Sequence, residues 1–175
     1  MSKPLLLVLD GHDASGKTTL ATALADQIGV PCIRPFFGHR GSHMLKAAEA
    51  GNHAEVQTTA LQMLAEALAT PAPVQVLDRH WMTVFTLLPA DHWEPWFPLP
   101  PTFLCAADLA TTIARLRQRG EERVAEHRKH RYYIRLYQQL AVRFGVPVIR
   151  TNRVDQKVAL QTLIRWAQSS IEKHT

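Results

Sequence analysis

The chain has 175 residues, which is enough for one domain with a full hydrophobic core, and 46% of them are hydrophobic. Its apolar runs are too short to cross a bilayer, and the first ten residues lack the pattern of a signal peptide. The net charge of +5 favours anionic partners. We therefore expect a single domain over residues 1–175 that lies in the cytoplasm and has no membrane partner.

The first predicted element is the apolar run LLLVLD at residues 5–10, which is typical of a buried strand. The residues GHDASGKT at 11–18 follow at once and fit the pattern G-x-x-x-x-G-K-[ST]. Glycines let successive backbone N–H groups converge on an anion, and the helix expected next adds the positive end of its dipole. The loop therefore predicts a nucleoside-triphosphate site, in which Lys17 reaches the β- and γ-phosphates and Thr18 ligates Mg²⁺.

The remaining elements alternate between strands and helices. Further strands are predicted at 31–34, 74–78, 102–108 and 146–152, and further helices at 42–50, 53–70, 109–119, about 124–144 and 155–171. The segment 89–101 holds five prolines and two tryptophans, so we expect an ordered loop there. This alternation predicts an α/β fold with a five-stranded, mainly parallel sheet covered on both faces, a three-layer α/β/α domain.

Arg34 and Asp78 each end a predicted strand. Ligands of such sheets bind beyond the carboxyl ends of the strands, so Arg34 and Asp78 are expected on the same rim as the phosphate loop. Asp78 is suited to the Mg²⁺ shell or to work as a base, although an aspartate there could also cap the next helix. Arg79 follows it where ATP-hydrolysing motors carry a water-activating glutamate. The pattern therefore favours transfer to a bound acceptor over transfer to water.

Several stretches, in chain order, resemble the thymidylate-kinase-like group of P-loop nucleoside and nucleotide kinases. The resemblance is carried by LDGHDASGKTTLA at 9–21, DRH at 78–80, LATTIARLRQRGEE at 109–122 and YYIRLYQQLAVRFG at 132–145. It implies a P-loop kinase fold with an arginine-rich lid at about 115–131. It also implies ATP and Mg²⁺ as cofactors, and transfer of the γ-phosphate to a nucleoside, nucleotide or related acceptor. By analogy with the family, a homodimer is the expected assembly if the chain is not a monomer.

The resemblance also implies roles for individual residues. Those expected to bind ATP are Gly11, Asp13, Ala14, Ser15, Gly16, Lys17, Thr18, Thr19 and Arg115. Those expected to act in catalysis are Lys17, Asp78, Arg79 and Arg119, with Mg²⁺ held by Thr18 and Asp78. Those expected to contact the acceptor are Asp13, Arg34, Arg79 and Arg123. For the arginines at 115–123, a solvated basic helix is the alternative.

Two stretches depart from the family pattern and leave other functions open. The residues RPFFGHRGS at 34–42 replace an REPGGT-like stretch, and 81–101 replaces a helical region that helps to enclose the nucleobase. A kinase for a hydroxymethylated pyrimidine base within DNA is one alternative. It would stack a base on tryptophans and meet phosphates with basic side chains, the candidates being Trp81, Trp93, Trp96, Arg128, Lys129 and Arg131. The tryptophans could instead pack the proline loop onto the core. A further alternative is a nucleotide-dependent ATPase that grips nucleic acid.

Overall fold

Five parallel strands form the centre of the computed structural model, which describes residues 3–69 and 71–174. The strands are β1 (Leu5–Asp10), β2 (Cys32–Ile33), β3 (Val74–Asp78), β4 (Thr102–Ala106) and β5 (Val148–Arg150). They lie in the order β2-β3-β1-β4-β5, and every pairing among them is parallel. The predicted sheet is confirmed, and it is parallel throughout.

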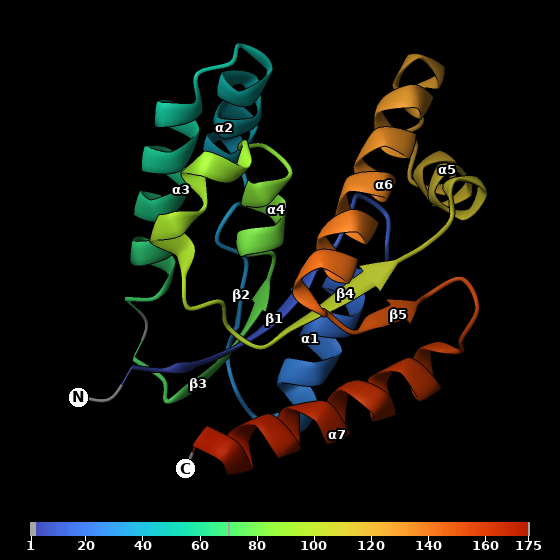
Figure 1. The fold of residues 1–175 in the computed structure, drawn as a ribbon. Helices are drawn as coiled ribbons and strands as arrows, with labels where there is room; N and C mark the ends of the chain where they lie inside the picture. The colour runs from blue at the N-terminus through green and yellow to red at the C-terminus, as the bar shows by residue number, and fades with distance from the viewer. Residues whose placement is uncertain (1–2, 70, 175) are drawn as a thin grey trace.

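Helices cover both faces of this sheet, as Figure 1 shows. They are α1 (Lys17–Ile28), α2 (His39–Glu49), α3 (His53–Ala67), α4 (Trp81–Phe85), α5 (Leu109–Gln118), α6 (His127–Phe144) and α7 (Gln156–His174). Three short 3₁₀ turns are added, η1 (Ala90–His92), η2 (Glu94–Trp96) and η3 (Val124–Glu126). Helices α1 and α7 lie on one face, whereas α2, α3, α4 and α6 rise from the other (Figure 1). The predicted three-layer α/β/α architecture is thus confirmed.

The hydrophobic core is divided by the sheet into two clusters. Successive side chains of a strand point to opposite faces, and β4 shows this alternation. Leu104 packs into the cluster formed with α3, α4 and α6, while Phe103 and Cys105 pack into the cluster formed with α1 and α7. A strand buried on both sides has no polar face, which is why the sequence shows continuous apolar runs rather than alternating ones.

The element boundaries differ from the predictions mainly around the proline-rich segment. The short helix α4 begins shortly after β3, in a stretch that the sequence pattern left unassigned, and η1 and η2 lie within the loop expected at 89–101. Helix α2 starts at His39, before the expected residue 42, and α3 ends at Ala67. The end of the helix expected at 53–70 falls on residue 70, which lies outside the described residues.

The tryptophans pack the proline-rich segment onto the core. Trp81 is 1% exposed and Trp96 is 5% exposed. Trp93 stacks on Phe85 with ring centroids 4.3 Å apart and nearly parallel planes. Trp81 also donates its indole N–H to Thr102 Oγ1 at 2.8 Å. Because these rings are held by the protein, they do not form the base-stacking platform that the DNA-kinase alternative required.

None of the described helices is both long and apolar enough to cross a bilayer.

Leu163 on α7 should be among the most sensitive positions for stability, because its side chain is fully buried between α7 and the sheet. We expect Leu163→Ala to lower the free energy of unfolding by about 2–5 kcal/mol, since it removes buried apolar contacts and leaves a cavity. Leu61→Ala, at a side chain that is 37% exposed, should change it by less than about 1 kcal/mol. Denaturant titrations of the two variants measure both values. Equal losses would contradict the placement of α7.

Candidate active site

The loop between β1 and α1 has a backbone that favours glycine at two positions. Gly16 has a φ of 87° and Gly11 a φ of 153°. A Cβ on Gly11 would lie 2.3 Å from the carbonyl oxygen of Cys105 on β4, so the loop runs directly against the neighbouring strand. Helix α1 starts at Lys17 without a side-chain cap, which leaves first-turn N–H groups for an anion. The loop thus has the form expected of a phosphate site.

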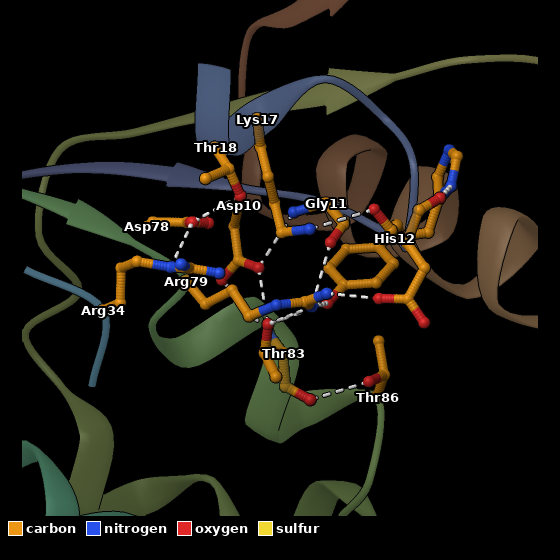
Figure 2. Close-up of polar contacts among 12 residues, drawn as sticks. Asp10, Gly11, His12, Lys17, Thr18, Arg34, Asp78, Arg79, Thr83 and Thr86 are labelled. Carbon is orange, nitrogen blue, oxygen red and sulfur yellow. Dashed lines mark hydrogen bonds and ion pairs between the residues drawn. The ribbon is translucent and has the colours of Figure 1, made fainter. Parts of the chain in front are cut away.

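Lys17 folds back across this loop, as Figure 2 shows. Its Nζ donates to the carbonyl oxygen of His12 at 3.2 Å. Burial, together with the charge of Arg79, lowers the pKa of Lys17 to about 8. A phosphate group bound in the loop would supply the negative charge that stabilises the ammonium form.

Thr18 and Asp78 lie together where a cation would bind. The Thr18 hydroxyl donates to Asp78 Oδ2 at 2.6 Å, and Arg34 Nε lies 3.3 Å from the same oxygen (Figure 2). The other oxygen, Oδ1, is buried and has no hydrogen-bond partner among the described residues. Hydroxyl and carboxylate oxygens are the ligands that Mg²⁺ prefers, so this pair fits a magnesium ion beside the phosphate loop.

Arg79 crosses the site and joins three parts of the fold. Its backbone has a φ of 83°, which is unusual for a residue other than glycine. Its guanidinium donates to the carbonyl oxygen of Gly11 at 3.1 Å, to Tyr137 Oη at 3.2 Å and to Asp13 Oδ1 at 2.6 Å. Burial by itself would lower the pKa of Arg79, but Tyr137, Asp13 and other acidic neighbours raise it above the ordinary value. Arg79 is therefore a fixed positive charge at the edge of the loop.

Asp10, at the end of β1, is a site residue that the sequence reasoning missed. Its carboxylate is fully buried and accepts hydrogen bonds from Gly11 N at 2.9 Å, His80 N at 2.9 Å and Thr83 Oγ1 at 2.7 Å. The Thr83 hydroxyl in turn lies 2.8 Å from Tyr137 Oη. This network fixes the start of α4 against the phosphate loop and so orients Arg79. The sequence feature that could have identified Asp10 is its charge, because Asp10 ends an otherwise apolar strand one residue before the first glycine.

Two histidines of the site are buried and neutral. His12 donates through Nδ1 to the carbonyl oxygen of Asp13 at 2.8 Å, and its Nε2 accepts from the N–H of Ala107 at 3.2 Å. His80 packs edge-on against Trp96 with ring centroids 5.8 Å apart. Burial lowers the pKa of each histidine to about 4. Both rings therefore act as uncharged packing groups near pH 7.

Two cavities meet at the phosphate loop. The smaller, of about 210 Å³, contains Lys17, Thr18 and Asp78 in its wall, and the larger, of about 470 Å³, lies between the loop, α2, α4 and α6. The larger cavity is lined by apolar and aromatic side chains together with basic, acidic and hydroxyl groups. They include Phe36, Phe37, Met44, Leu45, Leu87, Tyr133, Tyr137, Lys129, His130, Asp13, Glu126, Thr83 and Thr86. The residues that line both cavities are Asp13, Arg34, Phe36, Phe37 and Arg79. The phosphate loop therefore opens directly into a second chamber.

The arginines predicted for the lid take different positions. Arg115 donates to the carbonyl oxygens of Ala14 at 2.9 Å and Thr151 at 3.1 Å, which ties α5 to the phosphate loop. It also borders a third hollow of about 270 Å³ beside Gly16 and Thr19. Arg119 lines both this hollow and the smaller cavity. Arg123 is 77% exposed and is not among the described residues that line the cavities, but its Nη1 lies 3.9 Å from Oε1 of Glu126, which lines the larger one. The arginine-rich lid at 115–131 therefore stays a prediction.

Comparison with known proteins gives structural but no sequence matches. No protein-family model matches this sequence, and no curated protein matches it. Among solved structures, YorR from Bacillus subtilis in complex with phosphorylated GDP superposes with a TM-score of 0.65 at 18% identity, over 97% of this chain and 98% of that one. Shikimate kinase from Acinetobacter baumannii gives a TM-score of 0.61 at 16% identity, over 95% and 94% of the two chains.

The deoxyadenosine kinase from M. mycoides with bound dCTP also matches, with a TM-score of 0.53 at 12% identity, over 97% of this chain and all 100% of that one. At these identities the likeness concerns the fold alone. The chain has the P-loop kinase fold. The narrower resemblance to thymidylate kinases remains a prediction of the sequence.

The buried histidines should make the protein sensitive to acid. The pKa of His80 is about 4 in the fold, against an ordinary value of 6.5. Between these two pH values the unfolded chain therefore binds more protons than the folded protein. The contribution of His80 to stability is complete above pH 6.5 and is lost as the pH falls towards 4. Between about pH 7 and about pH 5 this loss is roughly 2 kcal/mol. We expect His80→Phe, which keeps an aromatic ring, to lose correspondingly less stability than the native protein over that interval, as measured by urea unfolding at both pH values. Parallel losses in the two proteins would contradict a neutral, buried His80.

Asp10 should matter for stability more than its short side chain suggests. In Asp10→Asn an amide N–H₂ replaces one of the accepting oxygens. This group can only donate, so the N–H and O–H donors that it faces lose their acceptor. We expect a loss of roughly 1–3 kcal/mol in the free energy of unfolding. Asp91→Asn, on the exposed turn η1, is the matched control and should be nearly neutral. Thermal or denaturant unfolding of both variants is the measurement, and similar stabilities would refute the role given to Asp10.

Proposed function

We propose that this protein is an ATP- and Mg²⁺-dependent kinase that transfers the γ-phosphoryl group to a nucleoside- or nucleotide-type acceptor. The observation that carries the proposal is the junction between the two cavities. The Thr18–Asp78 pair and Lys17 lie in the smaller one, while Arg34 and Arg79 border both. A donor held at the loop would thus have its terminal phosphate directed at the larger cavity.

On the donor side, the chain's own groups match the needs of phosphoryl transfer. The loop amides and Lys17 would hold the phosphates, and Thr18 and Asp78 would hold the metal. When bound, Mg²⁺ supplies charge neutralisation across the phosphates. Arg79 and Arg119 lie where positive charge could meet the migrating phosphoryl group, because both line the smaller cavity. Transfer of this kind depends on positioning and charge rather than on covalent steps by the protein.

On the acceptor side, the larger cavity has features that suit a nucleotide. Its volume of about 470 Å³ falls within the usual range of small-molecule sites. Phe37 and Tyr133 offer aromatic faces for a base, and Arg34, Lys129 and His130 offer positive or polar groups for a phosphate. Asp13 reaches the same cavity with a side chain that is 66% exposed, so it can accept a hydrogen bond from an acceptor hydroxyl. Bound phosphorylated GDP in YorR and dCTP in the deoxyadenosine kinase are consistent with this acceptor class.

The proposal does not extend to nucleic acid. Trp81 and Trp96 are buried, and of the three basic candidates Lys129 lines the larger cavity whereas the exposed Arg128 and Arg131 are not among the described residues that do. A base within DNA would need such groups at the entrance. Free nucleosides and nucleoside monophosphates are therefore the acceptors to test first.

Radiolabelled ATP with Mg²⁺, incubated with free nucleosides and nucleoside monophosphates, tests this function. We expect Lys17→Ala to abolish transfer, because it removes the cation of the phosphate loop. Asp78→Asn should slow transfer at least about tenfold, with a smaller effect on ATP binding, because a neutral amide is a weaker metal ligand than a carboxylate. Lys157→Ala, at an exposed lysine of α7, is the control and should be fully active.

Two results would overturn the proposed function. One is steady phosphate release from ATP with no label on any acceptor, which would indicate an ATPase. The other is full transfer by Asp78→Asn, which would remove the role assigned to the Thr18–Asp78 pair.

A further inference from the structure

Arg34 has an unusual position between the two cavities. It follows the edge strand β2 and lines both chambers. Its Nε lies 3.3 Å from Asp78 Oδ2, and its guanidinium carbon lies 4.2 Å from the centre of the Phe37 ring. The Arg34 side chain is 46% exposed, whereas that of Asp78 is 3% exposed. An exposed, flexible cation is therefore paired with a buried carboxylate.

The carboxylate in this pair is the one that fits a metal ion. Asp78 Oδ2 already accepts the Thr18 hydroxyl at 2.6 Å, and Arg34 approaches the same oxygen. A divalent cation beside this carboxylate would repel the guanidinium, because two positive charges a few ångströms apart interact unfavourably in a partly buried site. Arg34 and the metal ion therefore compete for Asp78.

We propose that Arg34 couples the two cavities. In the empty protein it neutralises Asp78, and binding of the metal–nucleotide complex displaces it towards the larger cavity. The inference rests on the proposed function, since it takes the smaller cavity as the donor site. The Phe37 ring lines both chambers and contacts Arg34, so it gives the displaced guanidinium a surface to remain on.

The displacement has a consequence for the acceptor. Freed from Asp78, the guanidinium becomes a positive charge without an ion-pair partner, at the wall of the larger cavity. An anionic group on the acceptor would then bind more tightly after the metal–nucleotide complex than before it. By linkage, the acceptor would strengthen metal–nucleotide binding by the same factor. The protein would thereby favour a complete pair of substrates over hydrolysis of ATP alone.

Magnesium dependence of nucleotide binding tests this proposal without any turnover. A non-hydrolysable ATP analogue, AMP-PNP, is titrated into the protein by calorimetry at a series of Mg²⁺ concentrations. The variant is Arg34→Gln. The matched control is Arg40→Gln, which removes the same charge from the neighbouring helix α2, where Arg40 pairs with Glu66 and does not line the cavities.

We expect Arg34→Gln to need about twofold to fivefold less Mg²⁺ for half-maximal binding of AMP-PNP. The reason is that the variant lacks a partly exposed ion pair that competes with the metal for Asp78. Its affinity for AMP-PNP without metal should be unchanged or weaker, because a cation near the triphosphate is lost. Arg40→Gln should keep the Mg²⁺ requirement of the native protein. A purely structural role of Arg34 would not lower that requirement, and a general effect of net charge would lower it in Arg40→Gln as well.

A second measurement follows the side chain itself. The Nε–H resonance of Arg34 in ¹⁵N-labelled protein is identified by its loss in Arg34→Gln. It should shift when Mg²⁺ is added to the AMP-PNP complex, because the guanidinium leaves Asp78.

The outcomes separate this inference from the proposed function. If the native protein binds AMP-PNP with Mg²⁺ dependence but Arg34→Gln needs as much Mg²⁺ or more, the coupling is wrong and the donor site stands. An Arg34 resonance that does not move on Mg²⁺ addition would likewise contradict the coupling and leave the donor site intact. If the native protein binds no AMP-PNP at any Mg²⁺ concentration, the proposed function fails, and the coupling fails with it.

Discussion

The carboxylate of Asp10 joins the phosphate loop to the rest of the site. It accepts from Gly11 N at the start of the loop and from His80 N and Thr83 N at the start of α4. A buried carboxylate without such donors would be strongly destabilising, so the backbone around it has little freedom. Arg79 lies between these anchored points, and its guanidinium therefore has a defined place over the loop. The position of the candidate catalytic arginine thus depends on a residue that need not touch a substrate.

Three of the cations that line the two cavities are paired with carboxylates. Arg79 pairs with Asp13, Arg34 with Asp78, and Lys129 with Glu49. A site that binds polyanions gathers cations that would otherwise repel one another, and these carboxylates reduce the repulsion in the protein without ligands. The pairs differ in character, because Asp78 is buried whereas Asp13 and Glu49 are mostly exposed. Of these three pairs, the one with a buried carboxylate lies at the candidate metal position, which is why metal binding and Arg34 are linked there.

The sequence predicted the parts of the fold that depend on local pattern. The apolar runs, the glycine positions and the helix periodicities identified the five strands and most of the helices, and Thr18 and Asp78 were expected near one another. Other features were missed or misplaced, such as the short helix α4 and the role of Asp10. Five residues of α4 are too few for a helical periodicity, and the hydrogen bonds of Asp10 reach residues about 70 positions away in the chain. Arg115, assigned to ATP, makes its hydrogen bonds to the backbone of the phosphate loop and to Thr151.

The sequence by itself determined the phosphate loop, because its geometry follows from glycines and a helix start that are adjacent in the chain. It also determined the alternation of elements, and through it the order of layers, because parallel strands require crossover helices. Only the tertiary structure decided the form of the larger cavity, whose walls come from α2, α4 and α6. It alone also decided which arginines face that cavity and which face solvent. These features depend on long-range packing, in which side chains far apart in the chain compete for the same space and the same charges.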